Sequence, residues 1–338
     1  MNLMRKTVLV IAGIMLLALA IIGGWYLAGS VLRPGGQAET IVVALPRLES
    51  SALLWIAADQ GFFSQNGLDV TFREPTTGIA ALDELLEGKV DIAATSEYPL
   101  VGKAFQKEKL LIIGCIDKGD FMFLAARRDH GIDNVSDLKG KKIGLISGTI
   151  QDFYLGRFLE LNGMRTADVI LVSMKSSAES SGALMNGSVD AIVVSEPIVG
   201  EVRDLLGARA VVWPVQNRQP LFGLLVCREE WAQAHPGTII RFLDSAARAE
   251  DFMSGNPPLA KADMVRRMNT DDRVVEAAWS RNQFSLTLDQ SLVLALEDEA
   301  RWMIANNLTN GTEVPDFREY IYTDGLNTVK PGSVHIIG

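Results

Sequence analysis

Two distant segments of this 338-residue chain have nearly the same sequence. Residues 88–102 read GKVDIAATSEYPLVG, and residues 187–200 read GSVDAIVVSEPIVG. They keep a common register from glycine to glutamate, and then only Tyr98 lacks a counterpart. Each copy ends an apolar run with Ser-Glu and then reaches a proline, which suits the first turn of a helix. The repeat therefore predicts two copies of one strand–turn–helix unit, facing each other across a cleft.

The similarity continues upstream more weakly, so that residues 40–102 correspond to residues 142–200. This spacing is far longer than the roughly 20–50 residues of solenoid and propeller repeats. It favours two duplicated lobes over a repeat array. Chance similarity between two strand–turn–helix segments is the alternative, although the Gly-x-Val-Asp and Ser-Glu elements stay in register with each other.

Short apolar runs alternate with helix-like segments as far as residue 227, which is typical of α/β folds with a parallel or mixed sheet. From residue 229 to residue 307 the pattern is helical, and we expect its aromatic residues to pack in a core. The expected strands are 41–45, 68–73, 90–95, 110–115, 122–126, 143–146, 169–172, 189–194 and 222–227. The expected helices before residue 229 are 53–59, 78–86, 151–161, 178–185 and 198–206.

Composition excludes several classes of function. The formal net charge is −9 and no basic run occurs, which disfavours nucleic-acid binding because phosphate contacts need clustered Lys and Arg. The three His and two Cys lie too far apart for metal-ligand spacing, so we predict no metal and no cofactor. Cys115 and Cys227 lie in apolar runs typical of buried free thiols, with a disulfide between them as the alternative.

The N-terminus differs from the rest of the chain. An uncharged run from Thr7 to Gly29 follows Arg5 and Lys6, and it reaches the roughly 20 residues that span a membrane. We expect residues 1–30 to form a membrane anchor or signal segment, and residues 31–39 a linker. The remainder would lie in the periplasm, anchored to the inner membrane, or free in the periplasm if the segment is cleaved.

A set of motifs resembles those of a known family. AADQGFF at residues 57–63, NGLDV at 66–70, DLKGKKIG at 137–144 and SGT at 147–149 accompany the two repeat copies in this order. Together they resemble the nitrate/sulfonate/taurine-type substrate-binding proteins of ABC importers, a family that includes proteins handling the thiamine pyrimidine precursor. The resemblance covers residues 40–230.

The resemblance implies a type-2 periplasmic binding protein, with two α/β lobes, a two-strand hinge and a ligand between the lobes. The first lobe would comprise residues 40–126 and 223–338, including the C-terminal helices, and the second lobe residues 127–222. Strands 122–126 and 221–227 would be the two crossings. The protein would be a monomer that closes on a small ligand and docks on an ABC permease.

Ligands in open α/β sheets bind at the carboxyl ends of strands. The loops that the resemblance brings to this edge carry hydroxyls, and hydroxyl and N–H groups at helix N-termini suit a polar ligand. Tyr98 is a candidate for stacking on a ligand ring, whereas Trp55 is expected in the core. The expected ligand-binding residues are Glu49, Ser50, Ser51, Thr77, Gly78, Ser96, Glu97, Tyr98, Ser147, Gly148, Thr149, Ser195 and Glu196.

The three glutamates indicate the charge of the ligand. Glu49, Glu97 and Glu196 fall in the expected cleft loops, where Arg47 is the one cationic residue. A buried charge is costly unless it is paired, so a cationic or zwitterionic nitrogen compound would supply the partner. Two alternatives remain: Glu97 and Glu196 complement helix dipoles, and the ligand is a sulfonate or another oxoanion.

Two other classes of function stay in view. Some relatives of the resembled family synthesise the thiamine pyrimidine from their own reactive residues. The expected ligand loops contain no His or Cys, so we predict that the chain is not an enzyme. A membrane-tethered sensor is the second alternative, and it would report ligand to a signalling partner instead of a permease.

Overall fold

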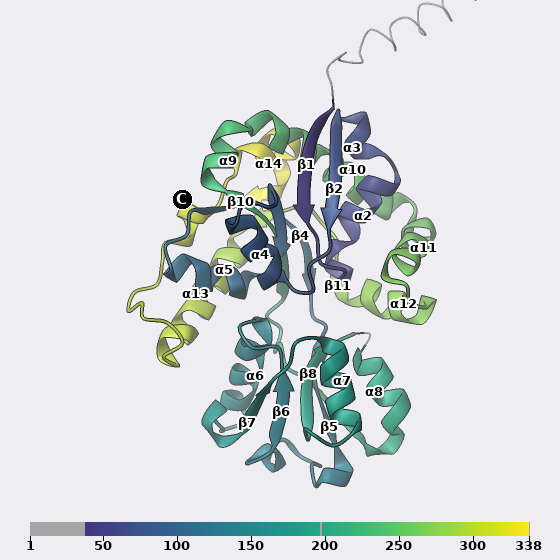
Figure 1. Cartoon of the computed structure of the whole chain (residues 1–338), viewed down its shortest axis with the longest axis vertical. Helices are drawn as coiled ribbons and strands as arrows, with labels where there is room; N and C mark the ends of the chain where they lie inside the picture. The colour runs from purple at the N-terminus through teal and green to yellow at the C-terminus, as the bar shows by residue number, and fades with distance from the viewer. Residues whose placement is uncertain (1–37, 197, 338) are drawn as a thin grey trace, which may run out of the picture. The chain divides into compact units, whose positions relative to one another are not determined.

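Two separate β-sheets organise the part of the chain that the computed structural model describes, residues 38–196 and 198–337. Both belong to the compact unit that begins at Glu39, and each carries its own helices (Figure 1). We call these two halves the first lobe and the second lobe. The expected two-lobe α/β architecture is therefore confirmed.

The first-lobe sheet has the strand order β11-β4-β10-β3-β1-β2. β1 runs parallel to β2 and β3, whereas β10 runs antiparallel to β3 and β4. The strands are β1 (Glu39–Ala44), β2 (Leu68–Arg73), β3 (Ile92–Thr95), β4 (Leu110–Gly119), β10 (Leu221–Arg228) and β11 (Asn282–Gln283).

The second-lobe sheet has the order β7-β6-β8-β5-β9, with β5 antiparallel to β8 and β9. It repeats the order β2-β1-β3-β10-β4 of the first lobe. β10, which follows the second lobe in the sequence, lies between β3 and β4 of the first-lobe sheet. β5, which follows the first part of the first lobe, lies between β8 and β9 of the second-lobe sheet. The repeat strands β3 and β8 thus occupy equivalent places. The strands are β5 (Met122–Arg127), β6 (Lys142–Leu145), β7 (Ile170–Ser173), β8 (Ala191–Ser195) and β9 (Ala210–Pro214).

The repeated aspartate has the same structural role in both lobes. Asp91 accepts a hydrogen bond from the N–H of Val42 in β1 at 2.8 Å, and Asp190 accepts one from the N–H of Lys142 in β6 at 2.9 Å. The glycine three positions earlier has a positive φ in each copy, 71° and 78°, which favours glycine. The Gly-x-Val-Asp element therefore turns the chain and ties the repeat strand to its neighbour.

The helices of the C-terminal third pack on the first lobe, as the resemblance implied (Figure 1). α10 contacts α2 and α3, α11 contacts α2, and α13 contacts α5. The described helices of the two lobes are α2 (Ala52–Asp59), α3 (Phe62–Gln65), α4 (Gly78–Leu86), α5 (Glu97–Phe105), α6 (Ile150–Leu161), α7 (Ser177–Met185) and α8 (Ile198–Leu206). The later ones are α9 (Glu229–Ala234), α10 (Pro236–Gly255), α11 (Pro257–Met268), α12 (Asp272–Arg281), α13 (Gln290–Ala305) and α14 (Asp324–Val329).

The lobe boundaries differ from those expected. Residues 122–126 were expected in the first lobe, but β5 pairs with β8 and β9 of the second sheet. Leu221 and Phe222 were expected in the second lobe, but β10 pairs with β4 of the first. The crossings are therefore the short segments 120–121 and 215–220. The predicted strands were real, and the error arose because a crossing strand and a buried sheet strand are equally apolar.

Short strands that were not predicted interrupt the helical region after residue 229. Residues 282–289 include β11 and β12 (Leu288–Asp289), and β12 pairs with β13 (Val334–His335). β9 was also missed. These strands are short, and their partners are distant in the sequence, so the local pattern does not reveal them.

Gln216 ties the two crossings together. Its Oε1 accepts hydrogen bonds from the N–H groups of Phe121 and Met122, at 2.6 and 2.7 Å. Its Nε2 donates to the carbonyl of Gly119 at 2.8 Å and to that of Gln219 at 3.1 Å. The side chain is 2% exposed. One buried amide therefore supplies partners to backbone groups of both segments that join the lobes.

The expected anchor or signal segment and most of the linker lie outside the described residues. Among the residues that the structure describes, no helix is both long enough and apolar enough to cross a membrane.

The two cysteines are free thiols in the structure, so the alternative of a disulfide is wrong. Both are buried in the first-lobe sheet, on neighbouring strands but out of register, since Cys115 lies opposite Leu224 and Cys227 lies opposite Leu111. The Sγ of Cys115 donates instead to the carbonyl of Asp117.

Candidate ligand-binding site

A cavity of about 140 Å³ lies between the lobes, and we call it the central cavity. Both lobes line it, through the 3₁₀ turn Glu49–Ser51 and the N-terminus of α4 on one side and the N-termini of α6 and α7 on the other. Phe121 in the first crossing and Leu221, the first residue of β10 after the second crossing, also line it. It contains these expected site residues: Glu49, Ser50, Ser51, Thr77, Gly78, Ser96, Thr149 and Ser195.

The helix starts around the central cavity are set by local hydrogen bonds. Thr77 Oγ1 accepts from the N–H of Ala80 at 3.2 Å, and Thr149 Oγ1 accepts from the N–H of Gln151. These hydroxyls therefore begin α4 and α6 as N-caps. The N-termini of both helices lie at the cavity, where their backbone dipoles favour negative charge.

Glu49 is the one ionisable residue that lines the central cavity in the described part of the chain. Its side chain is almost fully buried. Burial raises its pKa to about 7, repulsion from Glu196 acts in the same direction, and a hydrogen bond from its own backbone N–H opposes both. Near neutral pH this carboxyl is therefore poised between its neutral and charged forms.

Asp117 is a second buried acid next to Glu49, and sequence reasoning missed it. It lies in β4 opposite Gly223, and a Cβ at Gly223 would be 3.2 Å from Asp117 Cβ and 3.3 Å from Ser50 Cβ. Neither carboxylate oxygen has a hydrogen-bond partner among the described residues. Burial and repulsion from Glu49 raise its pKa well above the ordinary value. Asp117 could have been found from the sequence as an acidic residue within the largely apolar strand β4.

Thr95 was missed as well. It lines the central cavity, and its buried Oγ1 has no hydrogen-bond partner in the described residues. A Cβ at Gly78 would lie 2.7 Å from this Oγ1, so glycine at 78 is required for the close approach. Gln151 and Ser177, at the starts of α6 and α7, also line the cavity without having been predicted.

Glu196 was expected in the cleft, but it does not line the central cavity. Its Oε2 accepts from the N–H of Gly200 at 3.2 Å, and its Oε1 lies 3.4 Å from Arg203. Both partners belong to α8. Glu196 therefore complements the start of its own helix, as the dipole interpretation held, and it influences the cavity through its charge on Glu49.

Tyr98, Ser147 and Gly148 were also expected at the ligand, but they line a different cavity. Tyr98 is turned toward Phe153 and Trp302, with ring centroids 6.4 and 6.2 Å away. Trp55 is buried in the core, as expected.

Comparison with known proteins decides the family. Residues 49–260 match the model of the family described as NMT1/THI5 like. The chain belongs to the NMT1/THI5-like family. This confirms the resemblance found in the sequence motifs.

Relatives of this NMT1/THI5-like chain include both binding proteins and enzymes. A protein of Brucella abortus (strain 2308) named as a binding protein is 26% identical over 245 residues, covering 71% of this chain and 74% of the relative. The 4-amino-5-hydroxymethyl-2-methylpyrimidine phosphate synthase of Saccharomyces cerevisiae is 23% identical over 238 residues, covering 64% and 68%.

The fold is that of a periplasmic binding protein. The alkanesulfonate-binding protein SsuA from Xanthomonas axonopodis pv. citri, solved with bound MOPS, superposes with a TM-score of 0.74 at 16% identity. The match covers 85% of this chain and 99% of the other. The expected fold class is therefore confirmed for the NMT1/THI5-like chain, apart from the N-terminal segment.

Glu97, the third expected glutamate, points into the first lobe and not into the central cavity. Its Oε2 accepts from the N–H of Phe222 at 3.0 Å, and its carboxyl lies against that of Glu299 in α13. Both side chains have no exposed area. The directions differ because Ser96 is the extended N-cap of α5 and lines the cavity, whereas Glu97 is the first helical residue and is directed into the lobe.

Burial favours the protonated forms of the paired acids Glu97 and Glu299 in the folded chain, because it raises the pKa of both. Burial raises the pKa of Glu97 to about 8, and burial with repulsion from Glu97 raises that of Glu299 well above its ordinary value. The unfolded chain releases these protons above its ordinary glutamate pKa. The free energy of unfolding should therefore fall as pH rises from about 5 toward about 8.

We expect Glu299→Gln to raise the free energy of unfolding by about 1–2 kcal/mol near pH 8. The amide can donate to Glu97 without holding a titrating proton, so the decline between about pH 5 and pH 8 should become shallower. Urea unfolding at both pH values measures this, with the solvent-accessible Glu297→Gln as control. Equal pH dependence in Glu299→Gln and the parent chain would contradict it.

Proposed function

We propose that this chain is the extracytoplasmic solute-binding component of an ABC-type importer. The observation that carries the proposal is a central cavity that residues of both lobes line. A ligand in such a cavity contacts both lobes, so it stabilises a closed arrangement over an open one. The family, which includes proteins named as binding proteins, supports the same conclusion.

The ligand that we propose is a small nitrogen compound, cationic or zwitterionic. Glu49 is the one ionisable residue lining the central cavity in the described ranges, with Asp117 behind it. No Lys, Arg or His lines it there to balance an anion. A protonated nitrogen would pair with the buried Glu49 carboxylate through a charge-assisted hydrogen bond.

A sulfonate or another oxoanion is the second candidate. The N-termini of α4, α6 and α7 meet at the central cavity, and helix N-termini bind anions. A zwitterion would satisfy both features, with its acid at the helix N-termini and its amine at Glu49.

The proposal contains no catalytic step. In the described part of the chain neither His nor Cys lines the central cavity, and a pyrimidine-synthesising activity would need such reactive groups. The partner would be a membrane permease, and the N-terminal apolar segment would hold the lobes beside it in the periplasm. Co-purification with a kinase or cyclase instead of a permease would favour the sensor alternative.

A ligand panel tests the proposal directly. Native mass spectrometry of the full chain would detect a co-purified ligand, and thermal shifts would compare primary amines, aminopyrimidines, taurine, alkanesulfonates and nitrate. We expect stabilisation by compounds that carry a protonated nitrogen. Stabilisation by nitrate and simple alkanesulfonates alone would establish the oxoanion candidate instead.

The pH dependence of binding separates the two candidates. A cation prefers ionised Glu49, whose pKa in the free chain is about 7. The affinity for a primary amine should therefore rise about tenfold from about pH 6 to about pH 8, measured by calorimetry. An oxoanion prefers neutral Glu49, so its affinity should fall over the same range. Glu49→Gln should remove the dependence in either case.

A further inference from the structure

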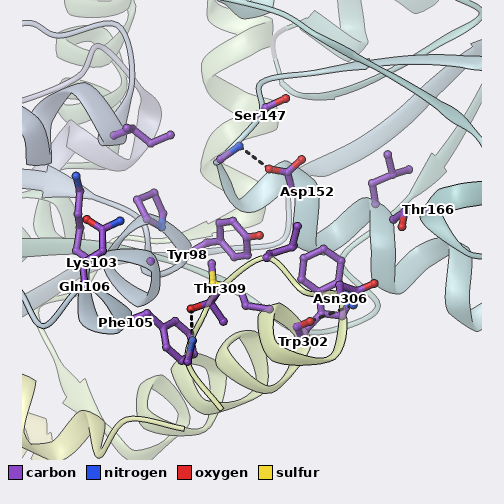
Figure 2. A pocket seen from close by; sticks show the side chains of 18 of the residues that line it. Tyr98, Lys103, Phe105, Gln106, Ser147, Asp152, Thr166, Trp302, Asn306 and Thr309 are labelled. Atoms are coloured by element: carbon purple, nitrogen blue, oxygen red, sulfur yellow. Dashed lines mark hydrogen bonds between the residues drawn. The ribbon is translucent and has the colours of Figure 1, made fainter. Parts of the chain in front are cut away.

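A second and larger cavity lies beside the central cavity, with a volume of about 740 Å³, and we call it the side cavity. The first lobe lines it through α5 and α13, and the second lobe through the Ser147–Gly148 turn and α6. Figure 2 shows Tyr98 and Trp302 on one side, with Ser147 and Asp152 across from them. An occupant would therefore also contact both lobes.

The two cavities share a boundary. Ile79 and Pro99 line both of them. Ile79 reaches the second lobe, since its Cδ1 lies 3.3 Å from the position of a Cβ at Gly148. The partition at this point is thus one flexible side chain of α4 against the backbone of the facing turn.

The volumes of the two cavities indicate which part of a ligand each would hold. The central cavity, at about 140 Å³, is close to a cavity that accommodates benzene. Ligand pockets usually measure about 300–1,000 Å³. The central cavity therefore holds a head group, and the side cavity offers the remaining space.

Part of the side cavity is lined by aromatic and aliphatic side chains. Trp302 packs edge-on against Phe153 at 5.6 Å and lies 6.2 Å from Tyr98, and Leu155 and Met303 add aliphatic surface. Its charged groups are already engaged. Lys103 pairs with Asp83 at 2.8 Å, and Asp152 accepts from the N–H of Gly148. These walls suit an uncharged aromatic or aliphatic group.

We propose that the side cavity is a second subsite for the same ligand, taking an uncharged apolar tail attached to the nitrogen head that Glu49 binds. This inference rests on the proposed function of the central cavity. The ligand class is then an amine with an aromatic or aliphatic extension, which passes between Ile79 and Gly148.

A glycine in the side cavity provides the test. Gly102 lies in α5, lines this cavity, and has no atom within 4 Å of the position of a Cβ. Gly102→Phe therefore introduces an aromatic side chain at the wall of this cavity, with open space around its Cβ. Gly182 in α7 is equally open, lines neither cavity, and gives the matched control Gly182→Phe.

The probes are benzylamine and phenylalkylamines with up to six methylenes, titrated calorimetrically into the full chain. We expect the affinity to rise at least about tenfold with tail length in the parent and in Gly182→Phe. Gly102→Phe should lose that gain and keep the affinity for benzylamine. Benzylamine binding with no gain from the tail, or a gain that persists in Gly102→Phe, would overturn the subsite alone. Failure of every amine to bind would overturn the cationic head and the subsite together.

Discussion

Glu49→Gln is expected to weaken the binding of a cationic ligand by about 100-fold. The substitution keeps the shape of the side chain but removes the charge that the ligand nitrogen would meet in a buried cavity. Removing one partner of a buried ion pair typically costs about 2–5 kcal/mol, because the other charge is left unpaired. Calorimetry at about pH 8, where Glu49 is mostly ionised, measures the change.

Glu196→Gln is the matched control for this result. Glu196 is also acidic and influences the pKa of Glu49, but it is engaged with Arg203 and with the N–H of Gly200. We expect less than about a threefold change in affinity from it, because Glu196 does not line the central cavity and its charge is already paired with Arg203. Equal losses in both variants, or no loss in Glu49→Gln, would refute the assignment of Glu49 as the cation partner.

Gln216→Leu is expected to lower the free energy of unfolding by about 3 kcal/mol. Leucine preserves most of the volume but leaves the N–H groups of Phe121 and Met122 without their acceptor and the carbonyl of Gly119 without its donor. Each buried group left unpaired costs about 1–3 kcal/mol. Urea unfolding, followed by circular dichroism, measures the loss.

Gln219 offers the control within the same crossing. Its Nε2 is buried without a hydrogen-bond partner in the described residues, so Gln219→Leu should be neutral or slightly stabilising. A destabilisation as large as that of Gln216→Leu would show that the crossing tolerates no substitution. The hydrogen bonds that Gln216 makes between the two crossings would then not explain the loss of stability in Gln216→Leu.

The repeated units were predicted well from the sequence because each of their motifs determines the local backbone structure. A glycine with positive φ followed by an aspartate that binds the neighbouring strand recurs in both lobes, and the strands and helices around it fall close to the predicted residues. The assignment of segments to the lobes and the packing of the C-terminal helices on the first lobe came from the family resemblance. Short strands such as β9 were missed because their pairing depends on distant segments.

The site was predicted less well than the fold, for a geometric reason. Ser96 and Glu97 are neighbours, yet one lines the cavity and the other is buried with Glu299, because the backbone changes from extended at Ser96 to helical at Glu97. Likewise, Asp117 lies near Glu49 because tertiary packing brings β4 against the 3₁₀ turn Glu49–Ser51. Strand ends can be found from the sequence, but the direction of each side chain there depends on tertiary packing.

The two crossings also impose an order on biosynthesis. All five strands of the second lobe lie between residues 122 and 214, whereas β10, which occupies the middle of the first-lobe sheet, begins only at Leu221. A chain made from its N-terminus thus possesses a complete second sheet while the first still lacks a central strand. β3 and β4 cannot be joined by β10 until the second lobe has been synthesised. A released chain that is truncated after residue 214 should yield one protease-resistant lobe, and it should be the second.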